Sequence, residues 1–185
     1  MSHASDELGA PGPAGWAHHG QARPAFAREP GPGEESVWDY PRPPVVRPDA
    51  RAVVVQLGNH VVARSDATYR LCETASPPTF YIPKTAIDSS VLVPSRSASW
   101  CEWKGRARYW HVVIGDTRIT DAAWGYPEAS GAYACLADTL AFYPSRLACF
   151  VAGQRVLAQG GGFYGGWVTP EIVGPYKGEP GTSGW

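Results

Sequence analysis

The sequence is densest in aromatic and charged residues at Trp100-Cys-Glu-Trp-Lys-Gly-Arg-Ala-Arg-Tyr-Trp-His-Val-Val-Ile114. Successive side chains of a β-strand point to opposite faces, so a half-buried strand is recognised by a period of two. With that period, the odd-numbered positions form a mainly apolar face. The charged residues share the opposite face: Glu102, Lys104, Arg106 and Arg108. The stretch predicts one strand over residues 100–114, with one face buried and one solvated.

A hairpin is predicted upstream of this strand. Two β-branched runs, Ala52–Leu57 and His60–Ala63, are separated only by Gly58-Asn59. A two-residue connection that begins with Gly is typical of the tight turns between antiparallel strands. We therefore expect the β domain to begin with this hairpin.

Further elements follow from the same patterns. Strands are expected at residues 68–74, 79–83, 117–120, 140–143, 149–151 and 155–158. Pro83 limits its strand to a sheet edge or a strand end, because proline has no N–H to donate. One helical turn is expected within 86–93, and Asp121–Pro127 is interpreted as a loop.

These elements give about eight short strands at 8–12-residue spacing and almost no helix, which predicts a mainly β fold, either an all-β sandwich or a folded-over sheet. No βαβ alternation occurs, so the doubly wound nucleotide-binding folds are excluded. Residues 1–47 are rich in Gly, Pro and Ala and are interpreted as a disordered tail that Val37–Tyr40 could anchor. Residues 48–159 form the predicted β domain, and 160–185 a Gly/Pro-rich extension that packs on it.

Composition restricts the partners and the location. A net charge of −1 and a pI of about 6.5 argue against nucleic-acid binding, which needs a concentrated basic surface. No signal peptide or run long enough to cross a membrane is recognised, so we expect a cytoplasmic protein with no membrane partner. The four cysteines stand alone and show no zinc-ligand spacing, so neither a metal nor a cofactor is predicted.

The side chains that could take part in acid/base chemistry are a carboxylate, an amine and several phenols. The predicted catalytic set is Glu73, Lys104 and Tyr109, because a burial-shifted carboxylate or amine can move a proton near neutral pH. The predicted ligand-binding set is Tyr81, Trp124, Tyr126, Tyr143 and Trp167. The alternative is that the tyrosines are ordinary sheet aromatics and that Glu73 and Lys104 form a cross-strand ion pair.

Cys101 is interpreted as a core residue. A nucleophilic thiol needs a partner that lowers its pKa. His111, ten residues along the same predicted strand, would lie about 33 Å away unless the strand breaks.

Four motifs, in this order and spacing, carry a resemblance to a known family. They are Pro78–Pro83, Cys101–Tyr109, Ala123–Pro127 and Leu140–Tyr143. With them the chain resembles the domain-of-unknown-function 427 family over roughly residues 50–158, although Pro127 follows Tyr126 at once and departs from the pattern. Gly161–Pro170 and the closing Gly184-Trp185 resemble the tail of an actinobacterial-type, and so bacterial, subgroup.

The resemblance implies a mainly antiparallel domain similar to the tent-like sheets of methionine sulfoxide reductase B and the cereblon ligand-binding domain, in which two sheets splay around a cleft. This chain lacks the cysteine pairs that hold zinc in those relatives, so it resembles a metal-free version. The family is also catalogued beside nucleotidyltransferases. We exclude that reaction because no Asp-x-Asp pair is present and Gly160–Gly162 do not precede a helix.

The sequence therefore predicts a protein that binds a small organic molecule in an aromatic cleft. One interpretation is a cofactor-free acid/base enzyme, that is, a hydrolase, lyase or isomerase; the alternative is a non-catalytic ligand- or peptide-binding module. A carboxylate or amine within about 3.2 Å of a tyrosine hydroxyl would favour the enzyme. A cleft lined only by Trp and Gly would favour the binding module, and the oligomeric state is left open.

Overall fold

The computed structural model describes residues 17–182, so expectations for residues 1–16 and 183–185 lie outside the described part. A seven-stranded antiparallel sheet has the order β2-β5-β6-β10-β9-β8-β7. Its strands are β2 (Val45–Asp49), β5 (Thr68–Glu73), β6 (Ser76–Pro83), β7 (Leu92–Cys101), β8 (Gly105–Ile114), β9 (Thr117–Gly125) and β10 (Thr139–Phe142). The mainly β, antiparallel prediction is confirmed.

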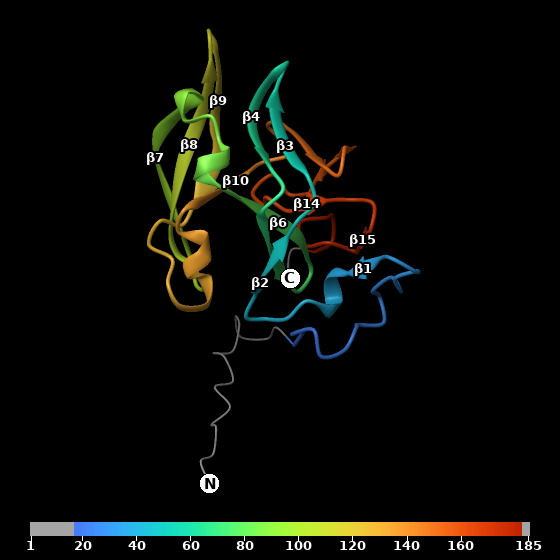
Figure 1. Ribbon diagram of the computed structural model, residues 1–185. Coiled ribbons are helices and arrows are strands. Elements are labelled where there is room, and N and C mark those ends of the chain that lie inside the picture. Colours follow the sequence, from blue (N-terminus) through green and yellow to red (C-terminus); the bar gives the residue numbers. More distant parts are fainter. Residues whose placement is uncertain (1–16, 183–185) are drawn as a thin grey trace.

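A second sheet has the order β12-β11-β3-β4. It contains β3 (Val53–Leu57), β4 (His60–Ser65), β11 (Ala148–Val151) and β12 (Gln154–Arg155). The pairs β3–β4 and β7–β9 stand as two separate arms, with β6 and β10 at their base (Figure 1). The predicted hairpin is confirmed, since β3 pairs with β4 across a turn in which Gly58 has the positive φ of 58° that such turns need.

The remaining elements are short. Two further strand pairs are β1 (Glu35–Ser36) with β15 (Ile172–Val173), and β13 (Leu157–Ala158) with β14 (Trp167–Val168). The 3-10 turns are η1 (Val37–Asp39), η2 (Lys84–Ala86), η3 (Ser89–Val91) and η4 (Gly131–Leu136). The turn expected within 86–93 is confirmed as η3, which Asp88 caps by accepting a hydrogen bond from the Ser90 N–H at 3.0 Å. Within residues 17–182, no helix is long and apolar enough to cross a membrane.

The prediction of one strand over residues 100–114 is wrong. β7 ends at Cys101, the chain turns through residues 102–104, and Cys101 pairs directly with Gly105 at the start of β8. Gly105 has a φ of 81°, a conformation that glycine adopts without strain, so it permits the reversal. Lys104 therefore lies in a turn and is buried, rather than on a solvated strand face.

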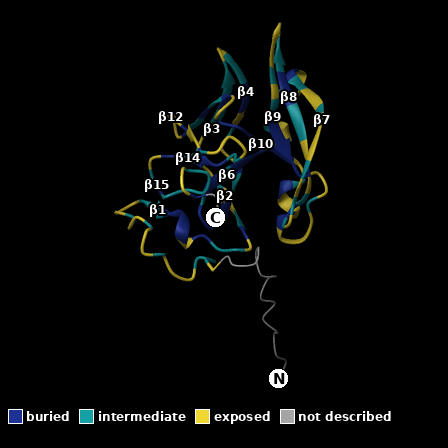
Figure 2. Cartoon of the chain, turned by 180° about the vertical axis from the view of Figure 1, so that it is seen from behind, coloured by how far each residue is buried: buried dark blue, intermediate teal, exposed yellow. Residues whose placement is uncertain are grey.

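The interpretation of Asp121–Pro127 as a loop is also wrong, because β9 continues to Gly125. Asp121 has a φ of 48°, and the register between β8 and β9 shifts beside it. This irregularity interrupts the period of two that would reveal a strand. The edge strand β7 was missed for a related reason, since its residues are mostly exposed (Figure 2) and include Pro94.

Prolines occur in β6 only where a missing N–H does not interrupt the pairing between strands. β6 lies inside the sheet between β5 and β10, so Pro83 marks a strand end and not an edge. Pro77 and Pro78 fall where the register between β5 and β6 shifts, so a missing N–H is tolerated there.

The main core lies between the two sheets. It contains aliphatic residues of both, such as Val55, Val62, Ile82 and Leu140, with Phe80 and Phe142. A smaller core forms where the N- and C-terminal segments meet, because Val37, Trp38 and Tyr40 are buried and the Trp38 indole N–H donates to the Pro175 carbonyl at 3.1 Å. The division into a disordered tail (1–47), a β domain (48–159) and an extension that packs on it (160–185) stays a prediction.

Candidate functional site

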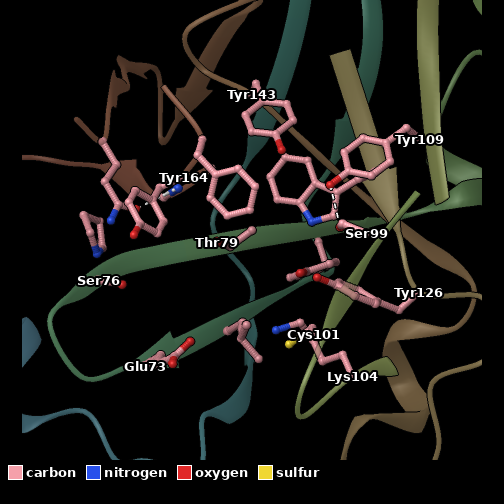
Figure 3. Close-up of a pocket in the computed structure, with 18 of the residues that line it drawn as sticks. Glu73, Ser76, Thr79, Ser99, Cys101, Lys104, Tyr109, Tyr126, Tyr143 and Tyr164 are labelled. Carbon is pink, nitrogen blue, oxygen red and sulfur yellow. Dashed lines mark hydrogen bonds between the residues drawn. The ribbon is translucent and has the colours of Figure 1, made fainter. Parts of the chain in front are cut away.

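A cleft of about 240 Å³ opens on the face of the seven-stranded sheet that points away from the main core (Figure 3). The end of the β7–β8 hairpin and the loop at residues 159–166 form its sides. All the predicted site residues except Trp167 line it: Glu73, Tyr81, Lys104, Tyr109, Trp124, Tyr126 and Tyr143. Residues far apart in the sequence are thus brought to one place, while their ligand-binding and catalytic roles stay predictions.

Sheet register explains the convergence. Tyr81 of β6 is opposite Ala141 of β10, Ala141 is opposite Trp124 of β9, and Trp124 is opposite Tyr109 of β8. Residues directly opposite in neighbouring strands share a face, so the four form one row across the sheet. Ala141 is the small member of the row and is 0% exposed, and the rings of Tyr81 and Trp124 on either side of it make an edge contact with centroids 6.4 Å apart.

Trp124 is the centre of the aromatic packing. Its ring centroid lies 4.3 Å from that of Tyr143 and 6.4 Å from that of Tyr81. Gly165 of the loop packs so closely that a Cβ there would be 2.0 Å from the indole ring. The loop therefore fixes the edge of Trp124, and only a glycine fits at that position.

The phenols in the cleft are neutral hydrogen-bonding groups. Burial raises the pKa of Tyr81, Tyr126 and Tyr143 above the ordinary value for tyrosine. A hydrogen bond of 2.8 Å joins the Tyr109 hydroxyl to Ser99 Oγ. The cleft thus presents protonated hydroxyl groups at neutral pH.

Lys104 and Glu73 have different environments. Lys104 is 7% exposed, and its Nζ lies 5.1 Å from the ring centroid of Tyr126. The Glu73 carboxylate accepts a hydrogen bond of 2.7 Å from Arg42, which also pairs with Glu102. Figure 3 shows Glu73 and Lys104 on the side of the cleft opposite Tyr109 and Tyr143.

The geometry of the cleft meets neither the condition set for an acid/base enzyme nor the one set for a binding module. Within residues 17–182, Glu73 and Lys104 form no ion pair with each other, and neither has a hydrogen bond to a tyrosine hydroxyl. The cleft is also not lined by Trp and Gly alone, since hydroxyl, amine and carboxylate groups all reach it. The arrangement can hold a ligand by ring contacts and hydrogen bonds, but it does not present a paired acid and base.

Trp167 lies outside the cleft, so its prediction as a ligand-binding residue is corrected here. Its side chain is 0% exposed in the main core, with its ring centroid 5.0 Å from that of Phe80. Its indole N–H donates to the Phe142 carbonyl at 2.9 Å. The neighbouring glycines, which suggested an open site, instead let the loop approach the sheet: a Cβ on Gly166 would lie 2.2 Å from Gln159 Oε1.

The interpretation of Cys101 as a core residue also changes. It lines the cleft beside Lys104 because the chain turns immediately after it (Figure 3). The strand break does not bring it a histidine partner, since His111 accepts a hydrogen bond from the Asp121 N–H at 3.0 Å. The cysteines of the described chain, Cys101 among them, are free thiols.

Several residues of the cleft were not predicted. Ser99 and Trp100 belong to the missed strand β7, and Phe163 and Gln159 to the loop. Gln159 holds this loop, because its amide accepts from the Gly166 N–H and donates to the Lys177 carbonyl at 2.7 Å. A single polar residue before a glycine run carries no sequence signal for that role. No group of three or more potential metal ligands occurs among the described residues.

A family model with the description "Domain of unknown function (DUF427)" matches residues 45–153, more than half of the 185 residues. No curated protein matches the chain. The family match ends before the C-terminal extension, so the subgroup inferred from that extension stays a prediction.

Proposed function

The chain belongs to the DUF427 family, and from that premise we propose that it binds a small organic molecule, flat and at least partly apolar, in the aromatic cleft. The family description gives no activity, so the proposal rests on the cleft. The observation that carries it is the row from Tyr81 to Tyr109, in which large aromatic residues surround a hollow instead of filling it.

Such a lining is typical of small-molecule sites, which combine aromatic walls with a few convergent polar groups. Here the walls are Trp124 and the tyrosine rings, and the polar groups include the hydroxyls of Ser99 and Tyr109 and the Lys104 amine. A volume of about 240 Å³ is below the usual range for drug-sized ligands, which favours a molecule of one or two rings over a peptide.

Binding without catalysis is the function that the geometry supports best. An acid/base enzyme requires a proton-transferring group within hydrogen-bonding distance of its partner or of the substrate. Glu73 is already engaged by Arg42, and Lys104 faces the ring of Tyr126, so neither activates a phenol. We also propose that the protein acts in the cytoplasm, where its free thiols would stay reduced.

The test is a thermal-shift screen of the purified protein against small aromatic and heteroaromatic metabolites, followed by calorimetry. A ligand that binds only the folded protein raises the unfolding temperature as its concentration exceeds the dissociation constant. Trp124→Phe should weaken binding by about 2- to 10-fold, since it changes a ring contact in the cleft.

The matched control is Trp167→Phe, the same substitution in the main core. It should lower stability and leave the affinity unchanged at a temperature where both variants are folded. A screen with no stabilising compound, or equal losses of affinity in both variants, would overturn the proposal.

A further inference from the structure

We propose that the ligand of the cleft carries a carboxylate, or an equivalent single negative charge, which pairs with Lys104. This inference rests on the proposed function and specifies the ligand class. The feature that points to it is a buried lysine that lines the cleft and has no anionic partner in the protein.

Lys104 is unusual for a lysine because it is only 7% exposed. Lysine is rarely buried to this extent unless its charge is paired, since loss of water around an ammonium group is unfavourable. In the described part of the chain no carboxylate lies within ion-pair distance of the Lys104 ammonium group. Its Nζ instead lies over the ring of Tyr126, 5.1 Å from the ring centroid. Figure 3 shows Lys104 extending from the β7–β8 turn beside Cys101 into the cleft.

The one carboxylate in the cleft has its ion pair with an arginine and not with Lys104. Glu73 accepts a 2.7 Å hydrogen bond from Arg42, whose side chain is 10% exposed. Arg42 also bonds to Glu102 and lies over the ring of Trp103, so it is held in place from several sides. Glu73 is therefore held by Arg42, and no ion pair joins it to Lys104.

Three buried phenols that line the cleft carry no charge at neutral pH. Burial keeps the phenols of Tyr81, Tyr126 and Tyr143 protonated, because it raises their pKa. Lys104 is the only cationic side chain among the described residues that line the cleft. A cationic ligand is disfavoured, since the ammonium group already covers the face of Tyr126 that such a ligand would use.

A single lysine also selects among anions. Phosphate carries up to two charges and is usually bound by several cations or by a helix N-terminus, neither of which the cleft offers. A carboxylate matches one ammonium group, and neutral tyrosine hydroxyls can donate to its second oxygen. The ligand body then lies against Trp124, and the exposed rings of Trp100 (77%) and Phe163 (70%) flank its outer end.

The experiment compares acids with neutral molecules of the same shape. Benzoate and indole-3-acetate are each paired with the primary carboxamide, and all four are titrated into the full-length protein by calorimetry at pH 7. A hydrogen bond to a charged group changes a dissociation constant by about 10- to 100-fold. We expect at least one acid to bind about tenfold or more tightly than its amide.

Variants then locate the charge. Lys104→Met and Lys104→Gln should abolish the preference for the acid while keeping weak binding of the amide. Lys84→Met is the matched control and should keep the preference, because Lys84 is 40% exposed beside Asp138 and does not line the cleft. The acid–amide comparison in the unmodified protein holds even if a Lys104 variant is unstable.

The outcomes separate this inference from the proposed function. Equal binding of acid and amide, or an acid preference that survives in a folded Lys104 variant, overturns the carboxylate proposal and leaves the binding function intact. The same holds if all four probes fail while the screen yields a neutral or cationic ligand. A screen without any ligand overturns the proposed function, and the carboxylate proposal with it.

Discussion

The two faces of the seven-stranded sheet are made by the same strands and differ in every other respect. In β6, Phe80 and Ile82 point into the main core, and Tyr81 between them points into the cleft. In β10, Leu140 and Phe142 face the core, while Ala141 packs with the aromatic cluster on the opposite face. One face is closed and packed with aliphatic and phenylalanine side chains, and the other is rich in tyrosine and hollow.

The difference arises from what covers each face. The second sheet and Trp167 pack against the closed face, so its side chains are in contact on all sides. The aromatic face is covered only by the loop at residues 159–166 and the end of the β7–β8 hairpin. Tyrosine rings pack with their apolar parts and keep their hydroxyls near partners or solvent, which leaves a site open. Alternate residues of one strand thus serve different purposes: those on one face stabilise the core, and those on the other face line the cleft.

Phe80→Ala should have the largest effect, because it makes a cavity in the closed face. Loss of a buried phenylalanine usually lowers the free energy of unfolding by about 3–5 kcal/mol. Phe80 is 1% exposed and also packs against Trp167, so we expect a value in this range from urea denaturation. A loss below about 1 kcal/mol would mean that the two faces do not differ in packing.

Alkaline pH should lower the free energy of unfolding, because the aromatic face contains buried tyrosines. Tyr81, Tyr126 and Tyr143 have a pKa in the folded state above the ordinary value of 10.0, because they are buried. Burial likewise raises the pKa of Tyr133 to about 12. The unfolded chain then loses protons first, so stability is complete below pH about 10 and falls as the pH rises further.

The expected slope is about 1.4 kcal/mol per pH unit for each tyrosine that stays protonated in the folded state. Urea denaturation at a series of pH values, together with phenolate absorbance, measures it. Ionisation of all tyrosines near pH 10 without unfolding would contradict the burial of these phenols.

Gly165→Ala should close part of the cleft. The new methyl group would be 2.0 Å from the rigid indole of Trp124, so either the loop or the ring must move. Overpacking of this kind lowers the free energy of unfolding by about 1–3 kcal/mol, and we expect ligand affinity to fall with it. Gly31→Ala is the control, since the nearest atom to its new methyl group, a carboxylate oxygen of Glu34, would lie at an ordinary 3.5 Å. Equal behaviour of the two variants would show that Trp124 adapts freely.

Tyr143→Phe should have the smallest effect on stability. It removes a single hydroxyl group, and the neighbouring Tyr109 keeps its 2.8 Å hydrogen bond to Ser99. The ring of Tyr143 also keeps Arg146 at 4.6 Å from its centroid. We expect a change below about 1 kcal/mol in urea denaturation, because no buried group is left unpaired. A loss above about 2 kcal/mol would mean that this hydroxyl holds the face together.

Regular alternation made much of the fold predictable. The β3–β4 hairpin followed from two β-branched runs around Gly58-Asn59, and the η3 turn from Asp88 as its cap. Prediction failed where the alternation is broken. Gly105 permits a reversal inside an alternating run, and Asp121 sits at a register shift, so one strand was predicted where there are two and a loop where β9 continues.

The candidate site followed the same division. Tyr81, Trp124 and Tyr109 were chosen for their chemistry, and sheet register brings them into one row. Trp167 was chosen on equal grounds but lies in the core, because it packs on the opposite face of the sheet beside Phe80. Gln159 and Ser99 could not be identified, since their roles depend on contacts with distant segments.

The sequence by itself determined the mainly β class, most strand positions and the supply of aromatic residues, because these depend on local propensity and on a period of two. Only the tertiary structure decided which aromatic residues fill a core and which surround a hollow. It also decided that Lys104 is buried and that Glu73 pairs with Arg42 instead. Pairing between strands is set by contacts between residues far apart in the chain, and no local pattern records them.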